Sequence, residues 1–150
     1  MKFQEGDRVE VQSKEDGFLG SYYEATVVTA VGKHKYLVKY KTLLTEDETE
    51  SLQEIVDASE VRPTPPEIKS FGAFGLLDVV DAFDNDGWWV GKTTGKGLYK
   101  YVVYFDKWKI KIGYPPSELR VHQDWVDGKW VRARKEWSTG RVVGVLDGLW

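Results

Sequence analysis

The sequence predicts an all-β fold made of two small antiparallel barrels side by side. Its strand-length runs are rich in β-branched and aromatic residues, and no segment shows a convincing helical period. The order of segments in the first half also returns in the second half. KYLVKY at 35–40 matches KYVVYF at 100–105, and SEVR at 59–62 matches SELR at 117–120. A chain of 150 residues is long enough for two such units of about 60 residues each.

The first predicted unit covers residues 1–64. Its first strand is expected at 6–11, where apolar and polar residues alternate, and its second at 22–31, which is rich in Val, Thr and Tyr. The remaining expected elements, in order, are a polar loop at 12–21 that carries Phe18, a turn at 32–34, a third strand at 36–40, the acidic loop TEDETE at 45–50, and a closing segment at 55–62.

The second predicted unit covers residues 70–136 and follows the sequence PTPPEIKS, whose prolines cannot donate ladder hydrogen bonds. Its expected elements, in order, are strands at 76–83, 88–94, 98–105 and 107–113, a break at Pro115 and Pro116, a closing segment at 117–120, and one strand at 124–136 that runs back. Residues 137–150 have no counterpart in the first unit and form a C-terminal tail of unknown role.

The aromatic content and the charge distribution indicate a binding protein. Seven Trp and eight Tyr exceed what two small cores need, so some of them are expected at a surface or groove. Residues 1–62 carry a net charge of −5 (8 Lys/Arg, 13 Asp/Glu) and residues 63–150 a net charge of +2 (13 and 11). The acidic half favours a basic partner, such as a Lys/Arg-rich peptide, over nucleic acid as the main partner.

Nothing in the sequence predicts an enzyme, a cofactor or a metal. Cysteine is absent, which excludes a disulfide framework and cysteine-ligated zinc. His34 and His122 lack partners at the spacing of a metal site or a catalytic triad. The Gly/Lys-rich segment 91–97 lacks the spacing of a phosphate-binding loop and is interpreted as a hairpin connection. No apolar run approaches the roughly 20 residues of a membrane span, and the N-terminus does not resemble a signal peptide.

Several motifs together resemble a tandem cassette of Agenet domains, the plant branch of the Tudor-like modules. They are GDRVEV, EDGFLGSYYEATVV and KYLVKY in the first half, and VDAFDNDGWWVG, YVVYF and SELR in the second. The resemblance covers roughly residues 3–135. It implies small Tudor-like barrels, no catalysis, a nuclear location, and a chromatin reader that recognises methylated lysine on a histone tail. A monomeric cassette and a di- or trimethylated histone H3-type peptide are the expectations that follow.

The Tudor-like layout places cage aromatics in the first loop, at the start of the second strand and at the end of the third. Applied to the first unit, this layout gives the favoured cage: Phe18, Tyr22, Tyr23 and Tyr40, with Tyr22 on the opposite face from Tyr23 and as a possible packing residue. Glu46, Asp47 and Glu48 are the expected acidic rim. Aromatic faces suit a methylated ammonium because cation–π contact contributes roughly 0.5–2 kcal/mol per ring.

The same layout gives an alternative cage in the second unit. Its members are Phe83, Trp89, Phe105 and Trp108, with Asp84 and Asp86 as the acidic residues. The second unit has the stronger cation–π faces because they include Trp, whereas the first unit has the more acidic rim.

Two other functions stay open. The basic second half and its aromatics could bind nucleic acid, or the chain could be a scaffold that binds unmodified protein segments. For single residues, packing is the ordinary interpretation, and Tyr36, Tyr99, Tyr101 and Tyr104 are assigned to it. Lys107, Lys109 and Lys111 alternate along a predicted strand, which is typical of an edge strand protected from aggregation.

Overall fold

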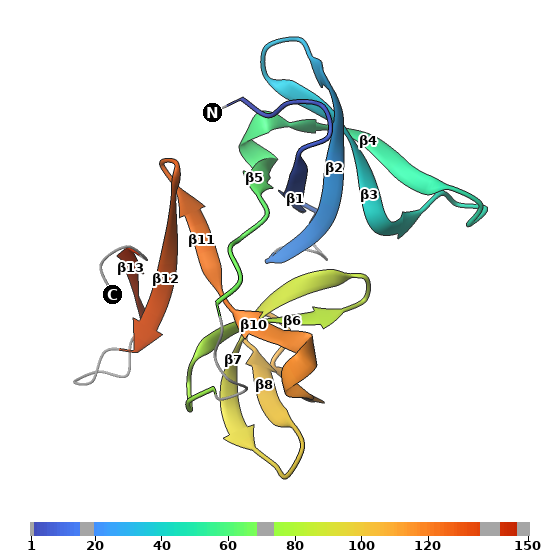
Figure 1. Ribbon diagram of the computed structural model, residues 1–150. Helices are drawn as coiled ribbons and strands as arrows, with labels where there is room; N and C mark the ends of the chain where they lie inside the picture. The colour runs from blue at the N-terminus through green and yellow to red at the C-terminus, as the bar shows by residue number, and fades with distance from the viewer. Residues whose placement is uncertain (1, 16–19, 69–73, 136–141, 147–150) are drawn as a thin grey trace. The chain divides into compact units, whose positions relative to one another are not determined.

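The structure is a computed structural model that describes residues 2–15, 20–68, 74–135 and 142–146 (Figure 1). Strands dominate it, which confirms the predicted all-β class. In this part of the chain the helical elements are two short 3-10 turns, η2 (Ala58–Glu60) and η3 (Pro116–Glu118), and no helix is long and apolar enough to cross a membrane. The chain forms two compact units, Met1–Thr64 with Asn85–Trp88, and Pro65–Asp84 with Trp89–Trp150.

The first unit is an antiparallel arrangement of five strands in the order β5–β1–β2–β3–β4. Their bounds are β1 Arg8–Gln12, β2 Ser21–Val31, β3 Lys35–Leu44, β4 Ser51–Asp57 and β5 Val61–Pro63. Alternate residues of each strand face inward and form one core cluster, which includes Val9, Val27, Val38 and Val56. This is the pattern that period-two burial produces in a sheet with one covered face.

The second unit repeats this order as β10–β6–β7–β8–β9. The bounds are β6 Val79–Asp84, β7 Gly87–Lys96, β8 Tyr101–Phe105, β9 Ile110–Tyr114 and β10 Leu119–Val121. Its core cluster includes Val80, Ala82, Val103 and Leu119. In both units, therefore, the closing strand, which begins within the SEVR or SELR motif, pairs with the first strand of its own unit.

In both units a phenylalanine that precedes the first strand packs against a tyrosine at the start of the third strand. The Phe3 ring meets Tyr36 edge-on at 5.6 Å, and the Phe3 backbone N–H donates to the Tyr36 hydroxyl at 3.0 Å. In the second unit Phe74 meets Tyr101 edge-on at 5.4 Å, and its backbone N–H donates to that hydroxyl at 3.3 Å. The packing roles predicted for Tyr36 and Tyr101 are thereby confirmed, since both side chains are buried.

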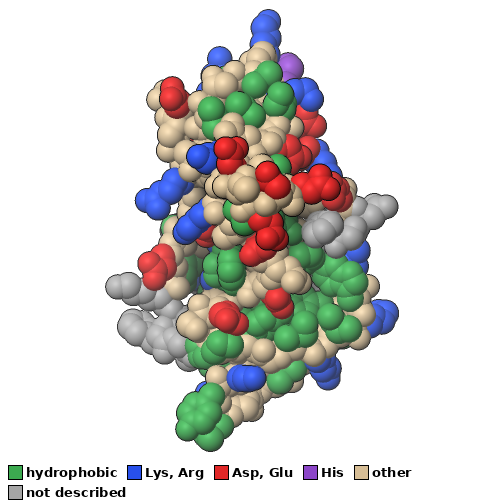
Figure 2. All heavy atoms as spheres, turned by 90° about the vertical axis from the view of Figure 1, so that its right-hand side faces the viewer, with side chains coloured by type: hydrophobic (Ala, Val, Ile, Leu, Met, Phe, Trp, Pro, Cys, Tyr) green, Lys and Arg blue, Asp and Glu red, His purple; other side chains and the backbone are tan. Residues whose placement is uncertain are grey.

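Three expected strands of the second unit start later than the sequence pattern suggested, at Val79, Tyr101 and Ile110. β8 begins at Tyr101, because the Gly97 backbone N–H donates to the Lys100 carbonyl at 2.7 Å and closes a turn there. Tyr99 lies in this turn with 79% of its surface exposed, so the prediction that it packs in the core was wrong. Large apolar side chains reach the surface elsewhere too, among them Leu98 and Ile55, and Figure 2 shows hydrophobic side chains at the surface.

Residues after β10 form a second, three-stranded sheet in the order β11–β12–β13. The expected single strand at 124–136 is instead a hairpin of β11 (Gln123–Val126) and β12 (Lys129–Lys135). Asp127 and Gly128 connect these strands with φ of 50° and 76°, the left-handed conformations that an Asp-Gly hairpin turn requires. Within the tail, β13 (Val142–Leu146) pairs antiparallel with β12.

Each unit also pairs an arginine with a buried carboxylate across its first and last strands. In the first unit Arg62 donates to Glu10 Oε1 from Nη2 at 2.7 Å and from Nε at 3.2 Å, and Arg62 lies 3.6 Å from the centroid of the Tyr22 ring. In the second unit Arg120 Nε donates to Asp81 Oδ2 at 2.8 Å. The register places these two pairs at matching positions of the two units.

Candidate functional site

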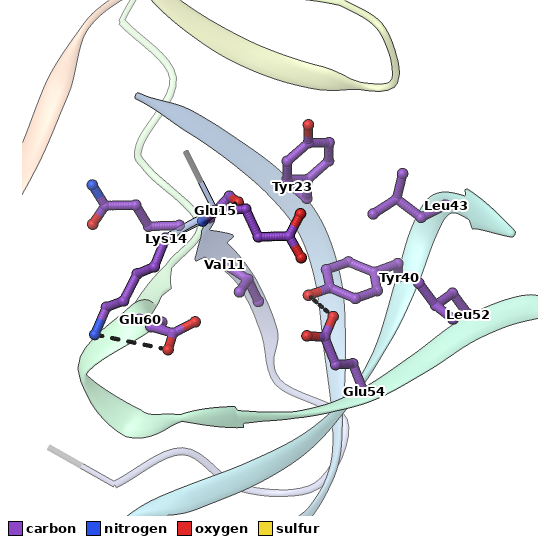
Figure 3. A pocket seen from close by; sticks show the side chains of 11 residues that line it. Val11, Lys14, Glu15, Tyr23, Tyr40, Leu43, Leu52, Glu54 and Glu60 are labelled. Carbon is purple, nitrogen blue, oxygen red and sulfur yellow. Dashed lines mark hydrogen bonds and ion pairs between the residues drawn. The ribbon is translucent and has the colours of Figure 1, made fainter. Parts of the chain in front are cut away.

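The first unit contains an open cavity of about 450 Å³ between its first loop and the ends of β2, β3 and β4 (Figure 3). Two tyrosines and three carboxylates gather there. The lining side chains that matter for its chemistry are Tyr23, Tyr40, Glu15, Glu54 and Glu60, together with Lys14 and the apolar Val11, Leu43 and Leu52. The charged residues of this lining sum to −2, because one lysine stands against three glutamates.

The pairing of β1, β2 and β3 brings the two tyrosines together. Val11 lies opposite Tyr23, and Ala25 lies opposite Tyr40, so the two rings stand on the inward face at one end of the sheet. Their centroids are 6.5 Å apart and the rings are nearly perpendicular, at 87°. Both tyrosines belong to the core cluster, so the cavity is the open end of the core rather than a separate feature.

Glu54 fixes one of these rings. The Tyr40 hydroxyl donates to Glu54 Oε2 at 3.0 Å, which settles the ring orientation from the far end of the side chain. Burial and the neighbouring Glu54 carboxylate both raise the pKa of Tyr40 well above its usual value. Burial likewise raises the pKa of Tyr23. Both hydroxyls therefore stay neutral at physiological pH, and the negative charge of the cavity comes from its glutamates.

Glu15 and Glu60 supply the remaining negative charge. Glu60 Oε1 lies 3.7 Å from Lys14 Nζ, an ion pair at the edge of the cavity. Burial raises the pKa of Glu60 above its usual value, and the Lys14 charge partly opposes this shift. Figure 3 shows Glu15 among these side chains, on the segment that leads into the first loop. An aromatic pair surrounded by carboxylates is an arrangement suited to an organic cation.

The other residues proposed for the first cage lie elsewhere. Phe18 lies outside the described residues. Tyr22 points to the opposite side of β2 from Tyr23, where its ring covers the Arg62 guanidinium. Glu46, Asp47 and Glu48 are exposed in the turn between β3 and β4 and do not line the cavity. The Asp47 carboxylate accepts hydrogen bonds from Thr45 and Thr49, which lower its pKa to about 2.

Sequence reasoning missed Glu15, Glu54 and Glu60. The sequence did contain a signal for Glu54. Leu52, Glu54 and Val56 are alternate residues of β4, so Glu54 lies on the same face as the core residue Val56. A carboxylate in an otherwise inward-facing apolar series indicates a site or a buried partner. The signal was hidden because the sequence pattern predicted only the last part of this strand.

The aromatic residues proposed for the second unit form a packed cluster. Trp108 meets Trp89 at 5.3 Å and Phe105 at 6.4 Å between ring centroids, both edge-on, and Phe105 meets Tyr114 at 6.2 Å. Trp108 is 38% exposed, and Lys107 Nζ lies 5.4 Å from its ring centroid. A lysine of the chain itself therefore already lies over one face of this ring.

The acidic residues proposed for this second cage are separated. Asp84 serves the cluster itself, because its carboxylate accepts from the Tyr114 hydroxyl at 2.7 Å and its carbonyl accepts from Trp89 Nε1 at 2.7 Å. Asp86 belongs to the other compact unit. Phe83 is half-buried on β6. The two proposed cages thus differ in kind: one is an open acidic cavity, and the other is a group of rings packed on one another.

The histidines do not combine with other groups into a metal site within the described residues, where no cluster of three or more candidate metal-ligating side chains occurs. His34 is exposed in the turn between β2 and β3. His122 is buried, and its two ring nitrogens lie 2.7 Å from Asp81 Oδ1 and 2.9 Å from Asp124 Oδ1. Burial opposes the charged ring, but the two carboxylates outweigh this effect and raise the pKa of His122 to about 9.

Comparisons with known proteins by sequence and by structure point to the same family. The sequence profile of the Agenet domain matches residues 6–66. The Arabidopsis thaliana protein AGENET DOMAIN (AGD)-CONTAINING P1 is 41% identical over 129 residues, which cover 85% of this chain and 25% of that protein. DUF724 domain-containing protein 3 of the same plant is 35% identical over 144 residues, which cover 92% of this chain and 21% of that protein. This chain thus spans about a quarter of the length of these relatives or less.

Two solved structures extend the similarity to both units. The crystal structure of Arabidopsis thaliana AGDP1 AGD34 matches with a TM-score of 0.81 and 41% identity over 85% of this chain and 88% of that one. The crystal structure of the ADCP1 tandem Agenet domain 3-4 matches with a TM-score of 0.77 and 38% identity over 85% and 86%. Since the profile ends at residue 66, the second unit is matched through these tandem structures.

Proposed function

This chain belongs to the Agenet domain family, and we propose that it is a non-catalytic chromatin reader that binds a methylated lysine of a histone tail in the first-unit cavity. The observation that carries the proposal is the gathering of Tyr23, Tyr40 and three glutamates around one open space of about 450 Å³. This volume falls within the range of roughly 300–1,000 Å³ found for ligand pockets. A nuclear location, and no need for a cofactor, follow from the same proposal.

The chemistry of a methylated lysine matches this cavity. Methylation removes N–H donors and enlarges the cation, so aromatic faces hold it better than hydrogen-bond acceptors alone. Glu54 and Glu60 supply the Coulomb attraction, and Glu15 would approach the ligand from the first loop. The remaining N–H of a dimethylated lysine would have a carboxylate to donate to. A di- or trimethylated histone H3-type tail is therefore the proposed ligand.

The flanking charge supports a Lys/Arg-rich peptide as the partner. Residues 1–62 carry a net charge of −5, and the cavity lies wholly within them. An acidic surface attracts a basic tail during encounter, mainly by raising the association rate. Phe18, in the first loop, is the proposed third aromatic, and Tyr22 serves the cavity only indirectly because it holds Arg62. Glu46, Asp47 and Glu48 are proposed to attract the tail at longer range.

The first experiment is a calorimetric titration with histone-tail peptides that carry unmodified, mono-, di- or trimethylated lysine. We expect micromolar binding of one methylated peptide and at least a tenfold loss, about 1.4 kcal/mol, without methylation. Equal binding of modified and unmodified peptides would instead support a scaffold that binds unmodified segments. Uniformly weak responses would exclude the reader function.

Variants of the two units locate the site. Glu54→Gln keeps the shape of the cavity but removes a charge, and Tyr40→Leu removes a ring face; both should weaken binding at least tenfold, provided that the variants stay folded. Trp108→Ala in the second unit is the matched control, because Trp108 is a partly exposed member of the alternative cage. If Trp108→Ala abolished binding while Glu54→Gln did not, the second-unit cage of Phe83, Trp89, Phe105 and Trp108 would be the site.

A further inference from the structure

We propose that the outward face of β7, β8 and β9 in the second unit binds single-stranded nucleic acid. We define this face by Lys92, Lys100, Val102, Tyr104 and Lys111. Lysines on it would hold the phosphates, and Tyr104 would stack on a base. The proposal concerns a surface outside the first-unit cavity, and it stands or falls independently of the methyl-lysine site.

The strand register places an aromatic ring between two lysines. Lys92 on β7 is paired with Tyr104 on β8, and Tyr104 is paired with Lys111 on β9. Val103 and Phe105 are buried in the core, so the side chain of Tyr104 between them faces outward. Neighbouring strands lie about 4.8 Å apart, which puts the two lysine stems about 10 Å apart on either side of the ring.

The next row of paired residues has small side chains, and a third lysine lies beside it. Gly95, Val102 and Gly113 are paired across the same three strands, so Val102 has a glycine on each side. A Cβ placed on Gly113 would lie 3.3 Å from Lys100 Cδ, which shows that the Lys100 side chain passes over this row. The two glycines add no side chains to this row, so a base could approach the backbone beside Tyr104 once the flexible Lys100 side chain turns toward a phosphate.

The charged residues on these three strands are all lysines. Residues 89–114 contain six lysines and one acidic residue, Asp106, a net charge of +5. Asp106 is paired with Lys109 at 3.7 Å in the turn that precedes β9. Within the described residues, Lys92, Lys100 and Lys111 form no ion pair. At the β7–β8 turn, Leu98 and Tyr99 are largely exposed between Lys96 and Lys100, which adds a second aromatic at the end of the basic strip.

The first unit provides an internal comparison. The corresponding row on β2, β3 and β4 is Thr26, Lys39 and Gln53. Residues 21–57 contain four lysines and seven acidic residues, a net charge of −3. The fold therefore does not require a basic aromatic face at this position. Protection of an edge strand would account for Lys111 on β9, but Lys92 lies on β7, which has a partner strand on both sides.

The aromatic ring decides between single-stranded and duplex nucleic acid. Lysines alone would bind any phosphate backbone, but a ring on a sheet face can stack only on a base that is not already stacked in a duplex. Base stacking on an aromatic side chain is tolerant of sequence, so the expected binding is non-specific and strongly dependent on salt.

The test is fluorescence polarisation with a labelled 12-nucleotide single-stranded DNA of mixed sequence, measured over a series of NaCl concentrations. For the triple variant Lys92→Gln, Lys100→Gln, Lys111→Gln we expect the slope of log K against log salt to fall by about 2, because each phosphate contact contributes about 0.7. Tyr104→Leu should weaken binding about tenfold with an unchanged slope. Circular dichroism and the unfolding midpoint establish that each variant is folded.

A second triple variant removes the same charge from the first unit. Lys2, Lys33 and Lys39 are exposed there, and replacing them by Gln should leave the affinity and the slope within twofold of the unchanged protein. The proposal is overturned if the two triple variants lose equal affinity, if Tyr104→Leu binds normally, or if a duplex of the same sequence binds as tightly as the single strand. Retained peptide binding by the second-unit variants would show that the two sites are separate.

Discussion

The two units share one fold and differ in what their inward and outward faces present. Both have the same strand order, a phenylalanine held by a tyrosine hydroxyl, and an arginine paired with a carboxylate across the first and last strands. At the open end of the core, however, the first unit has Tyr23, Tyr40 and Glu54 around a cavity, and the second has Trp89, Phe105 and Trp108 packed together. The first unit thus presents an open acidic cavity where the second presents rings that contact one another.

The buried charges show a second difference. Arg62 is 6% exposed in its side chain, stacks on Tyr22 and pairs with the fully buried Glu10. Arg120 is 21% exposed in its side chain, and it shares Asp81 with His122. His122 takes the place that Thr64 occupies after SEVR in the first unit. In the first unit, therefore, the buried arginine faces one carboxylate of the neighbouring strand, whereas the second unit has a chain of four charged groups that extends to Asp124 on β11.

The largest expected effect comes from breaking the buried pair of Glu10 and Arg62. Arg62→Ala leaves Glu10 buried without its cation, and we expect a loss of about 3–5 kcal/mol in the free energy of unfolding. Arg120→Ala should cost only about 2 kcal/mol, because His122 still faces Asp81 and water reaches the site. Urea unfolding at pH 7 measures both. Equal losses would mean that the two pairs are energetically alike despite their different burial.

The second unit should have a pH dependence that comes from His122. Its pKa is about 9 in the folded chain and about 6.5 in the unfolded chain. Because the folded pKa is the higher one, this stabilisation is fully present below pH 6.5 and is lost as the pH rises through 9. The size of the effect is about 3 kcal/mol. Urea unfolding at pH 6 and pH 9.5 measures it, and His122→Gln should remove most of the difference; an undiminished difference in that variant would assign it to other groups.

Gly91 lies where β7 and β8 of the second unit approach each other closely, and a substitution there tests whether this packing needs a glycine. A Cβ at this position would lie 2.5 Å from Val103 Cγ1 and 3.0 Å from the Tyr104 carbonyl oxygen. We expect Gly91→Ala to destabilise the protein by about 1–3 kcal/mol through overpacking. Gly95→Ala on the same strand is the control, because its Cβ would meet Val102 at an ordinary 3.7 Å. The motif alignment puts Ala25 at this place in the first unit, so a neutral Gly91→Ala would remove this distinction between the units.

The smallest expected effect concerns the ring that covers Arg62. Tyr22→Leu removes the cation–π contact at 3.6 Å and should cost about 1 kcal/mol more than Tyr22→Phe, which keeps the ring. Thermal unfolding of the two variants, compared at the same pH, measures the difference. If both variants lost the same stability, the contribution of Tyr22 would be that of its hydroxyl rather than that of its ring face.

Local pattern was sufficient for much of this protein. Period-two alternation and β-branched composition predicted an all-β chain, and the matched pairs KYLVKY/KYVVYF and SEVR/SELR predicted the repeat that the strand orders confirm. Alternation also put Tyr22 and Tyr23 on opposite faces, because successive side chains of a strand cannot share one. The resemblance to the Agenet family, which rested on these motifs, is confirmed by the family match.

Which side chains meet depends on how distant strands pair. Glu54 and Glu60 reach Tyr40 and Lys14 through pairing between segments distant in the chain, and pairing register is not written in any single segment. Turn closure at Gly97 moved Tyr99 from the predicted core to the surface, and the Asp127–Gly128 turn folded one predicted strand into a hairpin. The lysines of β7 and β9 indicated a binding surface only once strand pairing placed Tyr104 between them. The sequence therefore predicted the fold class, the repeat and the alternating faces. Long-range pairing determined the sites, because a site needs the relative placement of several strands.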